Sequence, residues 1–438
     1  YVHQHGVEYM ENEVEQTPGL PPWETTVMER LHATGYATAA FGKIHMLPPK
    51  GFDEMQLTLG KGARWTEAEG SPLGPAQLGP VYAEWLERKR PGAYESIYAQ
   101  RRLPEYRDQA TAIVNTLATD EYVDYWVAEN TIDYLERPDA GDEQPFFVWC
   151  GFCGPHTPFD PPEPYASLYD QADVPLSPLL HARQRNVTPS DQPSRFDRAD
   201  GEQVARKITA YYWGMVTFID DMVGKIMDVL TRRELWANSL ILFTSDHGEM
   251  LGDYGQLGKG NLTEPVINVP CIVVPPGGEP PADGRQRRTD RLVELIDLAP
   301  TMLDFAGIPR PDALPGSSLR PLLTPGTDPS QAPPSKDAVL CEYVSNDRQT
   351  RRACLRTSRY KYIASGSDRP VEFYDLHEDP RELVNVAANP AYQAEVHRHA
   401  ELLLHRLMTT TPFPWNSDQA SRDRERFDSF GRPITSHD

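Results

Sequence analysis

The sequence has 438 residues, of which 39% are hydrophobic, a net charge of -21 at pH 7 and a pI of about 5.0. The chain exceeds the length at which a single core stops growing, so we expect one large domain and a smaller one. A broadly acidic surface excludes nucleic acid and anionic membranes as general partners, although a few cations in a cleft still suit an anionic substrate. No run approaches the roughly 18 apolar residues that span a bilayer. The sequence leaves open a homo-oligomer and a cytoplasmic or periplasmic location, with the cytoplasm favoured.

Apolar spacing and turn residues predict alternating helices and strands over the first three quarters of the chain. In chain order the pattern predicts a helix at 24–34, a strand at 37–41, an irregular insertion at 60–115, a helix at 120–136, a strand at 145–150, a Pro-rich loop at 160–200, a helix at 202–231, strands at 239–244 and 269–274, and a helix at 291–306.

Two of these predictions concern the environment of an element as well as its type. Asp120 is placed to cap the helix at 120–136. The runs at 145–150 and 239–244 are continuously apolar, which is typical of strands covered on both faces. The alternation predicts an α/β fold with a mostly parallel sheet between helices, in which ligands gather at the carboxyl ends of the strands.

The character of the chain changes after about residue 325. Residues 324–335 are rich in Pro, Gly, Ser and Thr, as in a linker. Beyond it we expect a smaller antiparallel α+β subdomain with strands at 338–343, 352–357, 359–364 and 371–375 and a helix at 391–408. The predicted organisation is a catalytic domain at 1–325, a C-terminal subdomain at 336–410 and a tail at 411–438.

One strand end places a carboxylate beside an imidazole. Asp246 and His247 directly follow the strand at 239–244, and Gly248 lets the chain turn away. Oxygen from one residue and nitrogen from the other suit a divalent cation. Two ligands are too few, so others must come from elsewhere. The alternative is that Asp246 caps a helix and His247 is solvated.

Four further side chains bring positive charge or protons to similar positions. Lys43 and His45 lie two residues apart after a strand, so they point to the same side if the strand continues. His156 lies in a loop stiffened by prolines, and Lys259 stands between two glycines, twelve residues after the imidazole of the metal pair. Each has an ordinary alternative, a surface lysine or a packed histidine. Together they form a basic cluster that could neutralise charge on the oxygens of an ester.

The motifs, taken in order, resemble the sulfatase family of the alkaline phosphatase superfamily over nearly the whole chain. The similar segments are 42–45 (Gly-Lys-Ile-His, for the family's Gly-Lys-Trp-His), 154–159 (Gly-Pro-His-Thr-Pro-Phe, for its Pro-His-x-Pro loop), 245–248 with 251–253 and 257–259 (for its second metal motif and catalytic lysine), and 359–362 with 373–380 (for its closing subdomain).

The resemblance implies an alkaline-phosphatase-like fold and assigns roles to the basic cluster. Lys43 and Lys259 would grip sulfate oxygens. His45 would hydrogen-bond the nucleophile, and His156 would contact the sulfate or the leaving oxygen.

The resemblance also implies one divalent metal ion bound by Asp246 and His247. Calcium is the ion expected from the family. Many members have Asn where this chain has His247, and an imidazole tolerates manganese or zinc better than calcium, so these two ions stay open.

The chain departs from the family in its nucleophile. The family uses a formylglycine made from Cys or Ser in a Cys/Ser-x-Pro/Ala-x-Arg motif, and none of the five cysteines fits it. The family's first metal carboxylates are also missing. We therefore expect both to lie upstream of Tyr1, and these 438 residues alone not to turn over substrate. Cys150 and Cys153 are interpreted as buried, reduced thiols.

The predicted function is hydrolysis of a small-molecule or sugar sulfate ester. A phosphonate or phosphate mono- or diesterase on the same scaffold is the first alternative, because sulfate and phosphate esters share tetrahedral geometry. A non-catalytic relative that binds anions is the second alternative.

Overall fold

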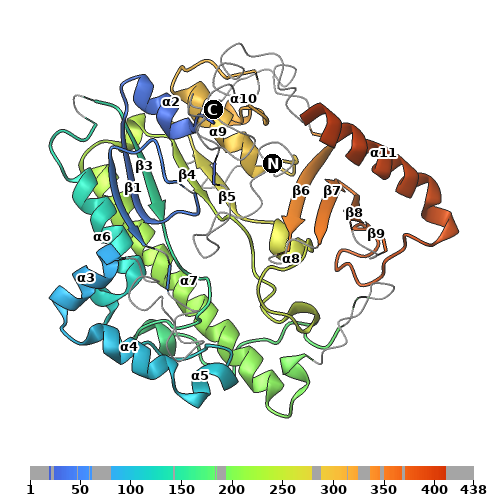
Figure 1. Cartoon of the computed structure of the whole chain (residues 1–438), viewed down its shortest axis with the longest axis horizontal. Coiled ribbons are helices and arrows are strands. Elements are labelled where there is room, and N and C mark those ends of the chain that lie inside the picture. The colour runs from blue at the N-terminus through green and yellow to red at the C-terminus, as the bar shows by residue number, and fades with distance from the viewer. Residues whose placement is uncertain are drawn as a thin grey trace, which may run out of the picture.

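The computed structural model describes residues 19–20, 24–46, 48–58, 60–61, 80–141, 144–182, 184, 194–278, 288–312, 314–323, 336–345, 350–366 and 370–410. Figure 1 shows two layered parts, one with β1–β5 and most helices and one with β6–β9 and α11. The predicted linker at 324–335 and tail at 411–438 lie outside the described residues, and the predicted domain boundaries stay predictions. No described helix is long and apolar enough to cross a membrane.

The first sheet is parallel and has β1 (Ala37–Lys43) at its centre. β1 pairs on one side with β2 (Glu54–Thr58) and on the other with β3 (Phe146–Gly151), parallel in both cases. The five middle residues of β1 are buried. β1 is two residues longer than predicted, which makes Lys43 its last residue.

The prediction that 145–150 is covered on both faces is wrong. In the described ranges β3 pairs with β1 alone, its residues are half-buried, and Trp149 is 42% exposed. β4 (Ile241–Thr244) is likewise half exposed rather than buried. It pairs antiparallel with β5 (Cys271–Val274) in a two-stranded sheet. An apolar run therefore located both strands but did not predict their exposure.

The helices cover the parallel sheet and give the larger part its core. α2 (Val27–Ala33) begins at a capping box made by Thr26 and Glu29, and α6 (Val123–Leu135) packs on β1 and β3. α7 (Gly201–Arg232) lies along α6 and buries the predicted apolar face. Asp120 lies in a preceding 3-10 turn and Tyr122 is the N-cap residue of α6, so the predicted cap is wrong.

The predicted irregular insertion at 60–115 is wrong over much of its length. Three short helices occupy it: α3 (Pro80–Lys89), α4 (Ala93–Arg101) and α5 (Pro104–Asp108). Their apolar residues are sparse and the helices too short to establish a period, yet Tyr82, Leu86 and Ile97 enter the same core as α6.

The last elements of the larger part are short. They are α8 (Glu264–Ile267), α9 (Leu298–Phe305) and α10 (Arg320–Leu323). The helix predicted at 291–306 is reduced to α9 and a 3-10 turn before it.

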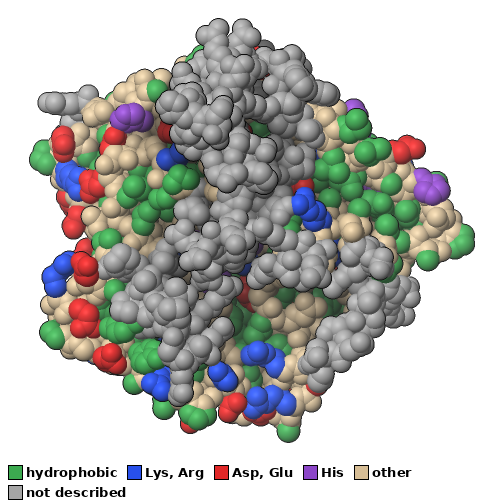
Figure 2. Space-filling model, viewed as in Figure 1, with side chains coloured by type: hydrophobic (Ala, Val, Ile, Leu, Met, Phe, Trp, Pro, Cys, Tyr) green, Lys and Arg blue, Asp and Glu red, His purple; other side chains and the backbone are tan. Residues whose placement is uncertain are grey.

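The C-terminal part is an antiparallel sheet with one helix against it, as predicted. Its strands follow in chain order as β6 (Ala338–Val344), β7 (Arg351–Thr357), β8 (Tyr360–Ser365) and β9 (Glu372–Asp375). α11 (Gln393–Thr410) packs on β7 and β8, and leaves Leu404 and Met408 more than half exposed. Figure 2 shows hydrophobic side chains on this side of the surface. The predicted fold class, an α/β part followed by an antiparallel α+β part, is confirmed.

Candidate active site

Lys43 is the last residue of β1 and lies where two glycines allow β1 and β3 to approach each other closely. A Cβ atom on Gly42 would lie 2.2 Å from the carbonyl oxygen of Gly151, and one on Gly151 would lie 2.0 Å from that of Lys43. Trp149 donates from Nε1 to the Lys43 carbonyl at 3.0 Å. The backbone of Lys43 is therefore fixed, and its side-chain stem passes Gly60.

Asp246 and His247 follow β4 with their backbone fixed by local contacts. The His247 amide donates to Asp246 Oδ1 at 3.0 Å, and His247 Nε2 lies 3.5 Å from Asp246 Oδ2. Gly248 donates to the Val266 carbonyl of α8 at 2.7 Å, and any Cβ there would lie 2.0 Å from the Pro265 oxygen. Only glycine fits this approach, which explains the residue after the pair.

The tautomer of His247 follows from its partner. Nδ1 lies 2.8 Å from the Gly248 carbonyl, which can only accept, so Nδ1 carries the hydrogen. Nε2 then presents its lone pair, and Lys259 Nζ donates to it at 2.6 Å. Burial lowers the pKa of His247 below its usual value, which favours this neutral form.

A closed loop brings Lys259 back to the imidazole. Glu249 Oε1 accepts from the amides of Leu251, at 3.2 Å, and of Gly258. The Met250 amide donates to the Gly258 carbonyl at 3.0 Å, so both ends of the loop meet. Gly258 has a φ of +84°, a conformation that L side chains rarely adopt. The loop between His247 and Lys259 therefore places the lysine beside the imidazole, twelve residues further along the chain.

His156 reaches the same place from the loop after β3. Its ring centroid lies 6.1 Å from that of His247, in an edge-to-face arrangement. Its Nδ1 lies 2.8 Å from the Thr157 carbonyl, so this histidine also carries its hydrogen on Nδ1. Burial and the positive charge of Lys43 lower the pKa of His156 to about 3.

Electrostatic effects tie Lys43 to the same cluster. Its charge lowers the pKa of both His156 and His247, as does the charge of Lys259. Desolvation raises the pKa of Asp246, but the positive charges around it outweigh this effect and leave the pKa below its ordinary value. The structure therefore brings five of the six predicted site residues together.

His45 is the sixth predicted residue. It lies two residues beyond β1 and is half-buried. Its predicted role stays a prediction.

Three buried charged residues beside the site were not singled out from the sequence. Lys61 adds a positive charge that lowers the pKa of His156, and Asp124 and Asp160 hold the loop on which His156 lies. Asp124 is a lone carboxylate on the apolar face of α6, and that break in the pattern is the signal that could have found it.

The donor pair fits part of a divalent cation's coordination sphere. Asp246 supplies carboxylate oxygen, and His247 supplies a neutral imidazole with its Nε2 lone pair presented, which is the form that binds metals. Within the described ranges no group of three or more His, Cys, Asp or Glu residues gathers to hold a metal. One lone pair accepts one partner, so Lys259 cannot keep its contact with Nε2 while His247 binds a cation.

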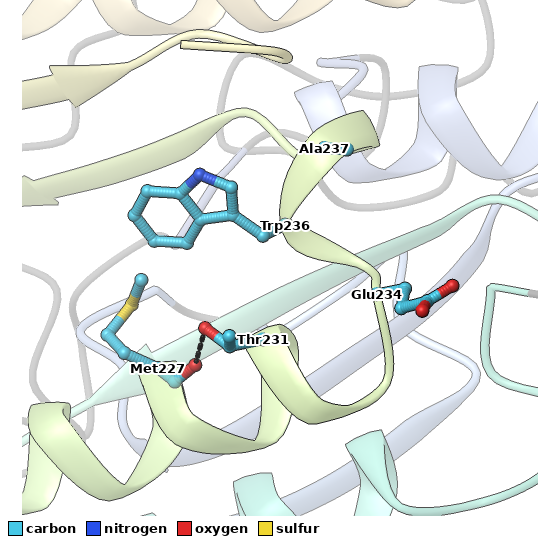
Figure 3. Close-up of a pocket in the computed structure, with 5 residues that line it drawn as sticks. All are labelled: Met227, Thr231, Glu234, Trp236 and Ala237. Carbon is cyan, nitrogen blue, oxygen red and sulfur yellow. Dashed lines mark hydrogen bonds between the residues drawn. The ribbon is translucent and has the colours of Figure 1, made fainter. Parts of the chain in front are cut away.

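A surface hollow lies apart from this cluster. It measures about 800 Å³ and lies at the end of α7, lined by Met227, Thr231, Glu234, Trp236 and Ala237. Figure 3 shows the Met227 side chain beside the Trp236 indole and Glu234 apart from both. None of the six predicted site residues lines it, and its lining holds no Lys, Arg or His that could bind an anionic ester.

Comparison with known proteins identifies the family of this chain. Residues 1–308 match the family model described as Sulfatase, and residues 252–409 match the model of the C-terminal region of N-sulphoglucosamine sulphohydrolase. The chain belongs to the sulfatase family. It is thus a sulfatase-family hydrolase within the alkaline phosphatase superfamily.

Curated relatives of the chain include both sulfatases and a broader hydrolase. An arylsulfatase of Clostridium perfringens is 25% identical over 395 residues, covering 88% of this chain and 78% of the relative. Arylsulfatase K of Gallus gallus is 31% identical over 396 residues, covering 84% and 65%. A multifunctional alkaline phosphatase superfamily protein of Trinickia caryophylli is 30% identical over 304 residues, covering 63% and 57%.

Solved structures agree with the fold. The phosphonate monoester hydrolase of Agrobacterium radiobacter has a TM-score of 0.70 and 25% identity, covering 94% of this chain and 84% of its own. A protein solved in complex with its substrate D-glucosamine-2-N,6-O-disulfate has a TM-score of 0.60 and 17% identity, covering 96% and 88%, and shows the fold alone.

Proposed function

We propose that this sulfatase-family hydrolase cleaves the sulfate ester of a small molecule or sugar at the cluster formed by Lys43, His156, Asp246, His247 and Lys259. The observation that carries the proposal is the 2.6 Å contact between Lys259 Nζ and His247 Nε2, because it joins an ammonium group to a cation-binding pair. Positively charged groups around one point suit a tetrahedral anion, and they act most strongly where water is excluded.

Each basic side chain has a separate role in this proposal. Lys43 and Lys259 bind sulfate oxygens and oppose the charge that develops on them during ester cleavage. His156 contacts the sulfate or the leaving oxygen. With Nδ1–H committed to the Thr157 carbonyl, its Nε2 donates a hydrogen bond only when it also carries a proton. His45 hydrogen-bonds the attacking group.

One divalent cation completes the proposed site, with Asp246 and His247 as two of its ligands. Bound there, it would add positive charge to polarise the ester and the attacking group. Calcium is proposed from the family resemblance. Manganese and zinc are the alternatives, because the imidazole of His247 suits them better.

The attacking group is proposed to be the formylglycine implied by the resemblance. No Cys or Ser of the 438 residues stands in the required Cys/Ser-x-Pro/Ala-x-Arg motif. Activity is therefore to be measured on the complete product of the gene, and formylglycine is to be sought by mass spectrometry of its peptides.

A phosphonate or phosphate esterase is the second candidate function. It is favoured by the similarity to the Agrobacterium radiobacter phosphonate monoester hydrolase at 25% identity over 94% of this chain. Matched aryl sulfate and aryl phosphonate esters with the same leaving group separate the two. A higher kcat/KM for the sulfate supports the proposal, and a higher value for the phosphonate supports the alternative.

Lys259→Ala tests the site itself. We expect it to lower kcat/KM roughly 100-fold, as loss of one preorganised charge contact does. Lys225→Ala, which removes an exposed lysine of α7, is the matched control and should leave activity unchanged. If Lys259→Ala lowers the melting temperature but leaves turnover unchanged, Lys259 is a structural lysine instead. A complete protein that binds sulfate but hydrolyses neither ester would favour the non-catalytic, anion-binding alternative.

A further inference from the structure

The loop that carries His156 is held at its start by a fully buried carboxylate. Asp124 of α6 accepts from the amide of Cys153 at 2.6 Å and from that of Gly154 at 3.1 Å. A Cβ on Gly154 would lie 2.7 Å from Asp124 Oδ2, so the loop presses directly on the carboxylate. Burying a carboxylate costs several kcal/mol unless partners satisfy it, and here the partners are the loop's own amides.

A second buried carboxylate holds the end of the loop. Asp160 accepts from Arg101 at 3.1 Å, Asn115 at 2.9 Å and Tyr122 at 3.0 Å, and Lys61 Nζ lies 3.4 Å away. These donors come from α4, from the segment after α5, from the residue before α6 and from the segment after β2.

The same cluster also reaches the loop backbone. Lys61 Nζ donates to the Pro158 carbonyl, and the Ile113 amide donates to the Phe159 carbonyl at 3.2 Å. The end of the loop is thereby tied to residues that the sequence analysis assigned to an irregular insertion.

Thr111, which lies in the segment after α5, contacts the middle of the loop through its side chain. Its Oγ1 lies 2.8 Å from Thr157 Oγ1 and accepts from the Phe159 amide at 3.4 Å. Both contacts fall within three residues of His156. Of the contacts that hold the loop, the one made by the Thr111 hydroxyl to Thr157 lies closest in sequence to His156. Removing this hydroxyl leaves no buried charge without a partner.

We propose that Thr111, Asp124 and Asp160 are positioning residues: they fix the loop at 154–160 so that His156 faces the catalytic cluster, and they touch neither ester nor cation. This inference rests on the proposed function, in which His156 meets the ester. A displacement of about 1 Å in such a group can cost up to 100-fold in rate, so a loop with three separate anchors serves catalysis beyond its contribution to stability.

The test compares Thr111→Ala with Thr111→Ser in the complete protein, each alone and combined with His156→Ala. The serine keeps the hydroxyl and loses only a methyl group. We expect Thr111→Ala to lower kcat about tenfold with little change in KM, and the serine to recover most of the turnover. If Thr111 acts through His156, Thr111→Ala should cost less than about twofold further once His156 is removed. Equal losses in both backgrounds overturn the inference.

A measurement that needs no turnover separates this inference from the proposed function. Hydrogen–deuterium exchange of the peptide covering residues 153–160 should be faster in Thr111→Ala than in wild type, and close to wild type in Thr111→Ser. Unchanged exchange in the alanine variant overturns the positioning role even if the protein is a sulfatase. A wild-type protein that hydrolyses neither ester overturns the proposed function, and the exchange result still decides whether Thr111 holds the loop.

Discussion

Lys361 offers the sharpest test of how the two parts of the molecule are joined. It lies on β8 and is fully buried, with Nζ 2.7 Å from Glu264 of α8, 2.6 Å from Glu382 and 3.2 Å from the Leu262 carbonyl. Burial lowers the pKa of this ammonium, but the two carboxylates outweigh burial and raise it above its usual value. Lys361→Met should therefore remove the cation from two acids at once.

The magnitude follows from what the substitution leaves behind. Glu264 keeps Arg356 at 3.5 Å, whereas Glu382 is fully buried and has Lys361 as its close cation. Breaking a buried pair on one side costs about 3–5 kcal/mol, because the remaining charge has no compensation. We expect Lys361→Met to lower the free energy of unfolding by this amount. A Lys whose folded pKa is raised contributes its stability below the unfolded pKa and loses it only as pH rises through the folded value, so Lys361 should stabilise the wild-type protein at both pH 7 and pH 9.

The same substitution should reach the candidate site. α8 begins five residues after Lys259, and its Val266 carbonyl accepts the Gly248 amide at 2.7 Å, so loosening Glu264 should also lower turnover. Denaturant unfolding followed by fluorescence gives the stability, with the surface variant Lys225→Met as control. Lys361→Met/Glu382→Gln, which removes the orphaned charge, should recover at least about 1 kcal/mol. A single variant within 1 kcal/mol of wild type, or a double variant less stable than the single, would refute this reasoning.

Three further predictions concern the site, the sheet and the C-terminal helix. Asp246→Ala and His247→Ala should each abolish retention of a divalent ion, measured by elemental analysis after dialysis; full metal content in either variant contradicts the assignment. Gly42→Ala should lower the melting temperature and the soluble yield together, because its Cβ would lie 2.2 Å from a carbonyl of β3 at a φ of +94°. Burial lowers the pKa of His399, so stability should fall as pH drops below the unfolded value near 6.5, by at most about 1.4 kcal/mol per pH unit. His399→Gln should remove that part of the pH dependence, whereas substitution of the exposed His397 should not.

Local patterns predicted most of the fold, and the failures have a common physical cause. The helix α7 has an apolar stripe over nine turns, and its periodicity alone locates it within one residue at either end. α4 and α5 have too few turns to show a period, so they were interpreted as irregular chain. The run at 145–150 is apolar enough for a covered strand, yet Trp149 is 42% exposed, because exposure depends on neighbours that the run itself does not contain.

The residues of the candidate site also fall into two groups, those that the sequence could bring together and those that it could not. Lys43, Asp246 and His247 could be placed together because each follows a strand, and strand ends in an α/β fold are where ligands gather. Asp124 and Asp160 could not, since each is an isolated acid whose partners lie on other elements. Their role is visible only once the tertiary contacts are known.

The two histidines of the site show how the backbone decides which chemistry the side chains offer. Each donates Nδ1–H to a nearby carbonyl, His156 to Thr157 and His247 to Gly248, so each presents an Nε2 lone pair. The stretch 246–259 then holds both the imidazole that suits a cation and the ammonium that suits a sulfate oxygen, 2.6 Å apart. Because one lone pair takes one partner, Lys259 stays on His247 only while that nitrogen is otherwise unused. In the proposed function, the position of Lys259 is therefore linked to whether His247 binds a cation, which would couple assembly of the site to recognition of the ester.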